Sequence, residues 1–339
     1  MASSTPTATT LFRRLCWDGT VPIEVKIDSK ELPAGSDRTL ESFYIRAPRV
    51  SYLPLLIQEV KTFLFDLVLD EASAKDMKTD DWWFEAEGGA LLKWHWPVGL
   101  LYDLHLVAHP APDFQMKPFT IILHLASPPT DKLLFTPSIE TCKQSFMGQL
   151  KEADFLRWGN TKRVTSLRKE DQDGLWEGIV EHNFDDFWRI ASKIAPSPNP
   201  LAPPLTPNPS SPTLPAPSSR PASTQPPSGS DRDNAYSVRS VPVRIYLPDG
   251  PVIQDLVPPF LEDGLPHSLS LFLSAQLPLL FKPSPTSSLS PVDPNAPKSN
   301  LAFALIQGVI APLDCEMAWL GACMSGADGW VNVCIGLEK

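Results

Sequence analysis

Residues 146–157 read FMGQLKEADFLR and predict the helix around which the rest of the chain is organised. A Thr-Pro pair at 136–137 is typical of a helix start, and a Gly-Asn pair at 159–160 is typical of a helix end. At about 100° per residue, five apolar side chains fall on one stripe that we expect to be buried. They are Ile139, Cys142, Phe146, Leu150 and Ala153. The sequence therefore predicts one long amphipathic helix.

Lys151 lies outside that stripe, about 140° from its centre, so its amine is expected to face solvent. Met147 and Phe155 stand four residues before and after it, on the same flank of the helix. A solvated lysine is the ordinary interpretation of such a position. The neighbouring residues nevertheless describe an accessible amine bordered by two apolar side chains.

The size and charge of the chain exclude several classes of protein. At 339 residues it is too long for one small core, so two or three domains are expected. A net charge of −10 argues against nucleic-acid binding, which needs basic side chains to neutralise phosphates. Residues 1–10 lack the basic and then apolar pattern of a secretory signal. The apolar stretch 53–69 is interrupted by Gln, Glu, Lys and Asp, which argues against a membrane span, so we expect a soluble intracellular protein.

The cysteines and histidines do not form a recognisable catalytic or metal-binding pattern. The five cysteines are scattered, without a CxxC pair, which favours reduced thiols in a cytosolic protein. No zinc-ligand spacing occurs, and neither a metal nor a cofactor is expected. A hydrolase is the main enzymatic alternative, but no nucleophile elbow, metal-spaced His pair or phosphate loop is present. His95, between two tryptophans, is interpreted as a packed structural histidine.

The first part of the chain predicts an α+β unit. Apolar and polar residues alternate cleanly at 21–27, and a second strand is expected at 42–46. A helix is expected at 53–69, followed by extended segments that begin at 82–84 and end at 119–125. This order is compatible with a ubiquitin-like β-grasp, although other split α+β folds would also fit.

Residues 136–194 are predicted to be helical throughout. After the helix that carries Lys151, a second helix is expected from about Thr161 to Val180. A third is expected to begin after Asn183, whose side chain is a good N-cap. These segments predict a small helical bundle.

A Pro-rich segment separates this bundle from a second α+β unit. Thirteen prolines lie between residues 196 and 227, so 196–235 is interpreted as an extended spacer, with a PxxP ligand as the weaker alternative. Beyond it, the strand at 241–247 resembles the one at 21–27, down to a proline after the first valine. Further strands are expected at 251–257, 302–309 and 330–335, with helices at 268–280 and 316–324.

The predicted fold class is α+β, with two ubiquitin-like β-grasp domains flanking a helix-rich bundle domain. The same order of elements occurs twice, without obvious sequence identity between the two copies. The expected divisions are an N-terminal helical segment at 1–17, a first ubiquitin-like domain at 18–130, a helix-rich domain at 131–195, a disordered Pro/Ser-rich linker at 196–235 and a second ubiquitin-like domain at 236–339 with a disordered insert at 283–298.

The string FMGQLKEAD at 146–154 resembles the modification site of the autophagy protein 5 family. The resemblance extends from about Arg13 to the C-terminus. It is carried in order by WDGTVP at 17–22, WHWPVGLLYDL at 94–104, LWEG at 175–178, FDDFW at 184–188, IQG at 306–308 and WL at 319–320. Each motif is weak alone, but the ordered set is specific. The Pro-rich linker and the segment 283–297 depart from compact members of the family and affect loop lengths.

The resemblance implies that the chain is a substrate of conjugation and not a conventional catalyst. Lys151 would be the isopeptide acceptor for the ubiquitin-like autophagy protein 12, with Met147 and Phe155 as the modifier-docking flank. The conjugate would act as a ligase-like factor that promotes transfer of a second ubiquitin-like protein onto phosphatidylethanolamine during autophagosome formation. Implied partners are the conjugating enzymes of the pathway and the coiled-coil autophagy protein 16. The implied location is cytoplasmic, peripheral on the preautophagosomal structure membrane.

Two surfaces remain open to two interpretations. Trp94 and Trp96 are either core anchors or the border of a groove for a partner helix. Five basic residues within 157–169 form either a solvated helix face or a membrane patch: Arg157, Lys162, Arg163, Arg168 and Lys169. A scaffold that binds a coiled-coil partner but is never modified is the alternative function, and it differs only at Lys151.

Overall fold

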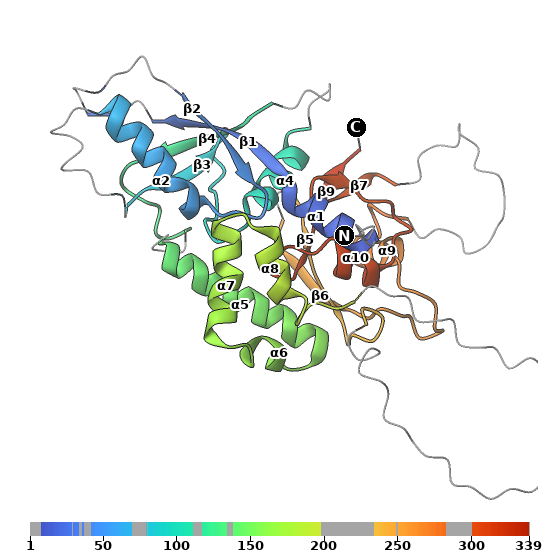
Figure 1. Ribbon diagram of the computed structural model, residues 1–339. Helices are drawn as coiled ribbons and strands as arrows, with labels where there is room; N and C mark the ends of the chain where they lie inside the picture. The colour runs from blue at the N-terminus through green and yellow to red at the C-terminus, as the bar shows by residue number, and fades with distance from the viewer. Residues whose placement is uncertain are drawn as a thin grey trace, which may run out of the picture.

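The structure is a computed structural model in which two sheet-containing units flank a helical bundle (Figure 1). The described residues are 8–28, 30–33, 36, 42–69, 79, 81–110, 117–133, 138–197, 234–248, 250–282 and 300–338. The spacer predicted at 196–235 and the insert predicted at 283–298 lie mostly outside them, as do Thr136 and Pro137. The ends of the spacer are described, and Ser197 pairs with Asn234 in an isolated parallel bridge.

The first sheet has the strand order β2-β1-β4-β3. Its strands are β1 (Thr20–Ile27), β2 (Ser42–Pro48), β3 (Trp83–Ala86) and β4 (Phe119–His124). The central pair, β1 and β4, is parallel, whereas β2 and β3 pair antiparallel at the edges. Helix α2 (Leu53–Phe63) continues into a π-helical turn, η1 (Leu64–Val68), and packs on the sheet through Leu53, Leu56 and Val60. This is the β-grasp topology, in which a parallel pair is joined through a helix.

The second sheet repeats this plan with the order β6-β5-β9-β7-β8. Its strands are β5 (Val241–Tyr246), β6 (Ile253–Val257), β7 (Ala302–Ile306), β8 (Val309–Ile310) and β9 (Val331–Leu337). The parallel pair is β5 with β9, and the helices are α9 (Leu269–Gln276) and α10 (Met317–Cys323). The single strand expected at 302–309 is two, because Gln307 and Gly308 both have positive φ and form a tight turn.

Each parallel pair contains a proline at a position that precedes the first pair of the parallel ladder. Pro22 in β1 and Pro242 in β5 cannot donate a backbone hydrogen bond, which normally keeps proline off central strands. In both sheets the parallel partner begins one residue later, at the pairs Ile23–Phe119 and Val243–Val331. The proline repeat noticed in the sequence therefore marks the same structural position in both units.

The bundle contains α5 (Ile139–Trp158), α6 (Lys162–Thr165), α7 (Lys169–Val180) and α8 (Phe184–Ala191). Helix α5 begins at a Ser138–Thr141 capping box and ends at Gly159, whose φ of 73° is left-handed, as the Gly-Asn signal predicts. Asn183 caps α8 as expected. Ile139 was expected in the buried stripe but is 52% exposed, because it lies in the first turn, before the helix reaches the bundle core.

The single helix predicted from Thr161 to Val180 is wrong, because the chain forms two helices there. Asp154 accepts a hydrogen bond from the Val164 amide at 3.2 Å and holds the short α6 against α5. Arg168 is extended, with ψ of 155°, and Glu170 and Asp171 then begin a new first turn, where acidic side chains favour a helix N-terminus.

Helix α4 (Val98–Ala108) was not predicted, because the sequence around it was interpreted as part of an extended unit. It is buried on two sides. Leu101 and Tyr102 enter the core of the first unit, whereas Leu100 and Val107 pack against Tyr246 and Cys334 of the second. A helix covered on opposite faces has no amphipathic period, so pattern analysis could not detect it. Among the described helices, α1 (Ala8–Asp18) included, none is long and apolar enough to cross a bilayer.

A buried ion pair joins the first and second sheet units. The Arg49 guanidinium, after β2, lies 2.5 Å from Asp103 on α4, and their side chains are 8% and 4% exposed. The same Asp103 oxygen accepts a hydrogen bond at 3.0 Å from the Gly308 amide in the β7–β8 turn. Burial raises the pKa of Asp103, and Arg49 opposes that shift. One carboxylate thus connects the first sheet, α4 and the second sheet.

We expect Asp103→Ala to lower the free energy of unfolding by about 3–5 kcal/mol, because it leaves the Arg49 charge buried without its partner. Equilibrium urea unfolding measures this. The matched control is Asp185→Ala, which breaks an exposed pair with Arg14 and should change stability little. Equal effects of the two substitutions would contradict the importance of the buried pair.

Candidate functional site

Lys151 lies in the middle of α5, on a half-buried position between the bundle core and the second sheet unit. The buried side of α5 contributes Cys142, Phe146 and Leu150 to the bundle core. With the residues that the structure describes, the Lys151 side chain makes no hydrogen bond and no ion pair. Its amine is therefore not committed to holding the fold.

The residues beside Lys151 bind the second unit. Arg244 of β5 donates to the Gln149 side chain at 2.5 Å and to Glu152 at 2.8 Å. Trp330 donates from its indole nitrogen to the Gln149 carbonyl oxygen at 3.1 Å, and the Arg244 guanidinium stacks on its ring at 3.7 Å. The helix is thus fastened to β5 and the start of β9 on either side of Lys151.

The polar residues at the end of the segment 146–157 also hold neighbouring elements in place. Asp154 is 2% exposed and holds α6, as described above. Arg157 is 5% exposed and donates to the Gly329 carbonyl oxygen, and burial lowers its pKa to about 10, against the opposing charge of Asp154. The Arg157 carbonyl oxygen accepts from the Arg239 amide at 2.7 Å. Arg157 therefore does not belong to a surface patch, and its inclusion in one was wrong.

The flank of Lys151 differs from the expected pair of apolar side chains. Phe155 is 49% exposed, one turn after the lysine, but Met147 is 9% exposed and packs in the bundle core. One turn before the lysine, the exposed residue is Gly148, where an added Cβ would meet no atom within 4 Å. Residues three and four apart are neighbours on a helix. Lys151 therefore lies between Gly148, which has no side chain, and the exposed ring of Phe155.

Gly148 has no packing reason that the structure shows. Glycine in a helix interior costs about 1 kcal/mol relative to alanine, and close packing usually explains it. Such packing does explain Gly178 on α7, where a Cβ would lie 3.1 Å from the Phe187 Cα. Open space at Gly148 instead leaves the approach to Lys151 clear. Gly148 is not among the residues predicted from the sequence, although it stands only three residues before the lysine.

The remaining basic residues lie at the far end of the bundle. Lys162, Arg168 and Lys169 are exposed, and the Arg163 guanidinium stacks on the Trp158 ring at 3.9 Å. Acidic side chains on α7 lie close by in the sequence, and Glu170 is exposed. Four of the five predicted basic residues therefore share the α6–α7 region, without Arg157.

Both tryptophans of the candidate groove have packing roles. Trp96 lies between the two sheet units, 5.2 Å from the Tyr246 ring in an edge-to-face contact, and the Lys93 ammonium lies 4.1 Å above it. Trp94 is half-buried against the bundle core. Where the three units meet, one small cavity of about 20 Å³ is lined by Arg49, Leu100 and Asn332 among others.

The described thiols and imidazoles do not form a nucleophilic site. Burial raises the pKa of Cys142 to about 12 and that of Cys16 to about 11, with Arg49 opposing the shift at Cys16. Burial, and then the charges of Lys93 and Arg244, lower the pKa of His95 to about 4. A thiol of that pKa is not a thiolate at neutral pH, and His95 is a poor base there.

Comparison with known proteins gives one consistent family. The models described as Autophagy protein ATG5, UblA domain, alpha-helical bundle region and UblB domain match residues 16–125, 139–197 and 240–335. The chain belongs to the autophagy protein 5 family. Its UblA and UblB domains are the first and second sheet units, which confirms the predicted fold class.

Relatives of this family cover nearly the whole chain. Autophagy protein 5 of Penicillium rubens is 29% identical over 346 residues, covering 95% of this chain and 96% of that protein. The protein of the same name from Aspergillus clavatus is 28% identical over 350 residues, with the same coverage. The crystal structure of Kluyveromyces marxianus Atg5 matches with a TM-score of 0.65 and 20% identity, over 96% of this chain and 99% of that one, and it supports the fold. A role in autophagy follows from this membership.

We expect Gly148→Ala to raise the free energy of unfolding by about 0.5–1 kcal/mol, because alanine restricts the unfolded chain and meets open space here. Equilibrium urea unfolding measures the change. The matched control, Gly178→Ala on α7, should lower stability because its Cβ meets the Phe187 backbone. A loss of stability in Gly148→Ala would mean that the glycine serves packing after all.

Proposed function

We propose that Lys151 is the acceptor of a covalent bond to a ubiquitin-like modifier, which in this family is autophagy protein 12. One observation carries this proposal. The string 146–157 contains five polar side chains, and four of them bind other elements: Gln149, Glu152, Asp154 and Arg157. The fifth is Lys151, which has no such partner among the described residues and stands beside the open surface at Gly148.

The chemistry needs little from the acceptor. The neutral Lys151 amine attacks the carbonyl carbon of a thioester between the modifier's C-terminal glycine and a conjugating enzyme. The C–S bond breaks, the thiolate leaves, and an isopeptide C–N bond forms as the nitrogen loses a proton. Alkyl amines are protonated at neutral pH, so the conjugating enzyme must remove a proton first. The role of this chain is to present the amine on a rigid helix.

The roles proposed for the conjugate rest on the family resemblance. The conjugate would act as a ligase-like factor that promotes transfer of a second ubiquitin-like protein to phosphatidylethanolamine. It would work in the cytoplasm and peripherally on the preautophagosomal structure membrane, with the conjugating enzymes of the pathway as transient partners. The two β-grasp units, which pack together through α4, support a role as a platform.

A coiled-coil partner, in this family autophagy protein 16, is part of the proposal. Trp94 and Trp96 are the residues suggested by the sequence, but both are engaged in packing. Helix α1 offers an additional apolar surface, because Leu11 and Leu15 are 48% and 60% exposed and lie four residues apart. An apolar stripe of this kind suits the face of an amphipathic helix.

Lys151→Arg should abolish the modifier's covalent band on denaturing electrophoresis while the fold is kept. Arginine retains the positive charge, but its guanidinium stays protonated and cannot act as the acceptor. The matched control is Lys143→Arg on the same helix, where the amine is paired with Asp173 at 2.6 Å. That variant should be conjugated normally. A band of undiminished intensity from Lys151→Arg would overturn the proposal, and no band from the unaltered protein would favour the unmodified scaffold.

The membrane contact is proposed for Lys162, Arg163, Arg168 and Lys169. Each basic side chain near an anionic lipid surface contributes about 1 kcal/mol, so this set suits reversible docking that weakens with salt. Replacing Lys162, Arg168 and Lys169 by Glu should cut flotation with anionic liposomes and leave Lys151 conjugation intact. The same reversal at three exposed lysines elsewhere, Lys117, Lys132 and Lys282, is the charge-matched control. Equal flotation of the two triple variants would show that the patch is only a solvated face.

A further inference from the structure

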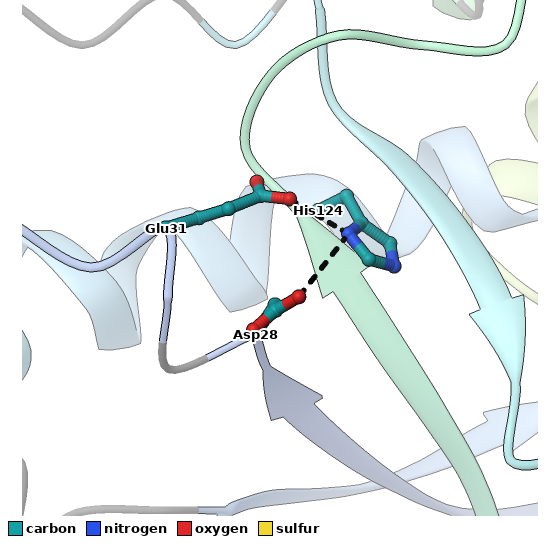
Figure 2. Close-up of side chains that lie close together, drawn as sticks. All are labelled: Asp28, Glu31 and His124. Atoms are coloured by element: carbon teal, nitrogen blue, oxygen red, sulfur yellow. Dashed lines mark hydrogen bonds and ion pairs between the residues drawn. The ribbon is translucent and has the colours of Figure 1, made fainter.

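Three metal-ligating side chains meet at one end of the first sheet, far from Lys151 in the sequence. Asp28 follows β1, Glu31 lies in the turn after it, and His124 ends β4 (Figure 2). Because β1 and β4 are parallel neighbours, the ends of both strands lie side by side. One ligand atom from each residue lies within 4.8 Å of the other two.

The distances within this cluster are close to those of a metal site. The His124 Nδ1 atom is 2.8 Å from a Glu31 oxygen and 4.0 Å from an Asp28 oxygen. Ligands held about 2.0–2.1 Å from a tetrahedral zinc ion are about 3.3 Å apart, which lies between these two values. An ion could therefore enter after the two carboxylates move to equalise these distances, and both carboxylates are partly exposed.

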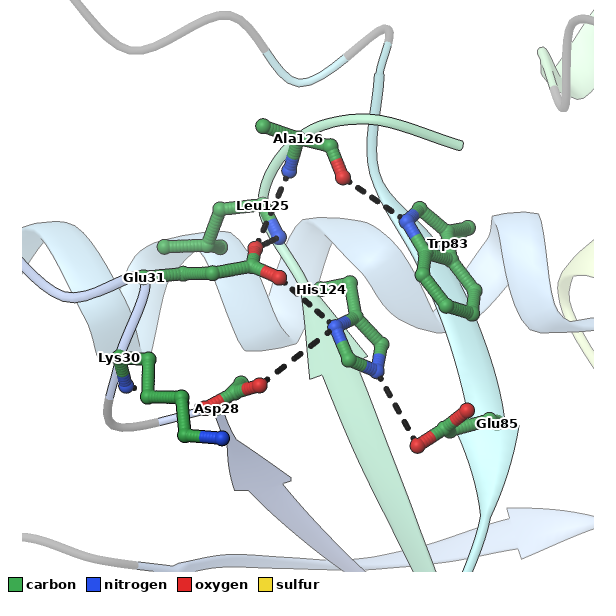
Figure 3. A network of polar contacts seen from close by, with 8 residues as sticks. All are labelled: Asp28, Lys30, Glu31, Trp83, Glu85, His124, Leu125 and Ala126. Carbon is green, nitrogen blue, oxygen red and sulfur yellow. Dashed lines mark hydrogen bonds and ion pairs between the residues drawn. The ribbon is translucent and has the colours of Figure 1, made fainter. Parts of the chain in front are cut away.

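The opposite side of the His124 ring has the surroundings of a metal-binding histidine. His124 is 8% exposed, and among the described residues its other ring nitrogen, Nε2, has no hydrogen-bond partner but faces Glu85 of β3 at 3.4 Å (Figure 3). Metal-binding histidines usually donate the second ring N–H to a carboxylate, which fixes the tautomer and strengthens the ligand. Glu85 is placed for this when Nδ1 binds metal and the proton resides on Nε2.

The imidazole and one carboxylate are already held in place. The Trp83 ring stacks on His124 at 3.9 Å with an interplanar angle of 9°, and its indole nitrogen donates to the Ala126 carbonyl oxygen at 2.9 Å. The second oxygen of Glu31 accepts from the amides of Leu125 and Ala126 at 2.5 and 3.2 Å. Little conformational freedom would be lost when these side chains bind an ion.

We propose that Asp28, Glu31 and His124 bind a divalent transition metal of the zinc class, with Glu85 as the outer carboxylate. One imidazole nitrogen with two carboxylates is a borderline donor set that suits Zn²⁺, whereas Mg²⁺ and Ca²⁺ prefer oxygen ligands alone. Three protein ligands leave a further position for water. The ion takes the place of the hydrogen bond between Nδ1 and Glu31, and its charge compensates three carboxylates around one histidine. It fastens the turn after β1 to the end of β4.

Zinc titration of the full-length reduced protein, followed by calorimetry, tests the proposal. The unaltered chain should bind one equivalent and unfold at a higher temperature with Zn²⁺ than with chelator. Asp28→Asn and Glu31→Gln should each weaken zinc binding at least tenfold, and Glu85→Gln should weaken it 10–100-fold as an outer-carboxylate change. Glu87→Gln, an exposed carboxylate just beyond β3, is the control and should bind normally.

The absorption spectrum with Co²⁺ distinguishes this site from the cysteines. Binding at Asp28, Glu31 and His124 gives no thiolate-to-cobalt charge-transfer band, whereas binding at Cys16 or Cys315 would give one. If Glu31→Gln fails to fold by circular dichroism, Asp28→Asn decides, because Asp28 lies in an accessible turn. The proposal is overturned by a folded protein that binds no zinc, which would leave the contact between His124 and Glu31 as a hydrogen bond. A thiolate band, or zinc binding that is unaffected by Asp28→Asn, overturns it equally.

Discussion

The buried Arg49–Asp103 pair is the interaction on which the arrangement of the two sheet units depends. Asp103 is bound by Arg49 from the first unit and by the Gly308 amide from the second. If either unit shifted, a buried charge would lose its partner. The backbone around it must come close. A Cβ at Gly99 would lie 2.9 Å from Arg49, and Gly308 combines a φ of 78° with an equally short approach. The pair thus dictates glycine at two places far apart in the sequence.

This constraint explains why α4 is buried between two sheets. Its Asp103 faces the ion pair, while Leu100 and Val107 pack against Tyr246 and Cys334 of the second unit. Trp96 closes the same seam next to Tyr246. The two β-grasp units therefore behave as one body with a shared helix, and that body supports α5 through the Arg244 and Trp330 contacts.

Most residues of the segment 146–157 hold the fold together, and a few lie at its surface. Phe146, Met147 and Leu150 build the bundle core, and Gln149, Glu152, Asp154 and Arg157 fasten the helix to its neighbours. Gly148 and Phe155 are exposed, and Lys151 between them is half-buried. The side chain of Lys151 is therefore the one polar group of the segment that the described contacts do not use to hold the fold.

The sequence alone determined the features that depend on local hydrophobic periodicity, on helix-capping residues and on the order of elements. Strand alternation gave β1, capping residues gave the start of α8 and the end of α5, and the repeated order of elements gave two β-grasp units around a bundle. The tertiary structure decided what depends on contacts between distant residues. It buried Arg157 against Gly329, divided the predicted second helix of the bundle at Arg168, and placed an unpredicted helix between two cores. It also brought Asp28 and Glu31 to His124, more than ninety residues away, because parallel pairing of β1 and β4 aligns their ends. The periodicity of a segment predicts which of its faces is buried when one face is buried and the other is exposed. It cannot predict a helix that is buried on two faces, or a site whose residues come from two strands, because both depend on contacts formed only in the folded chain.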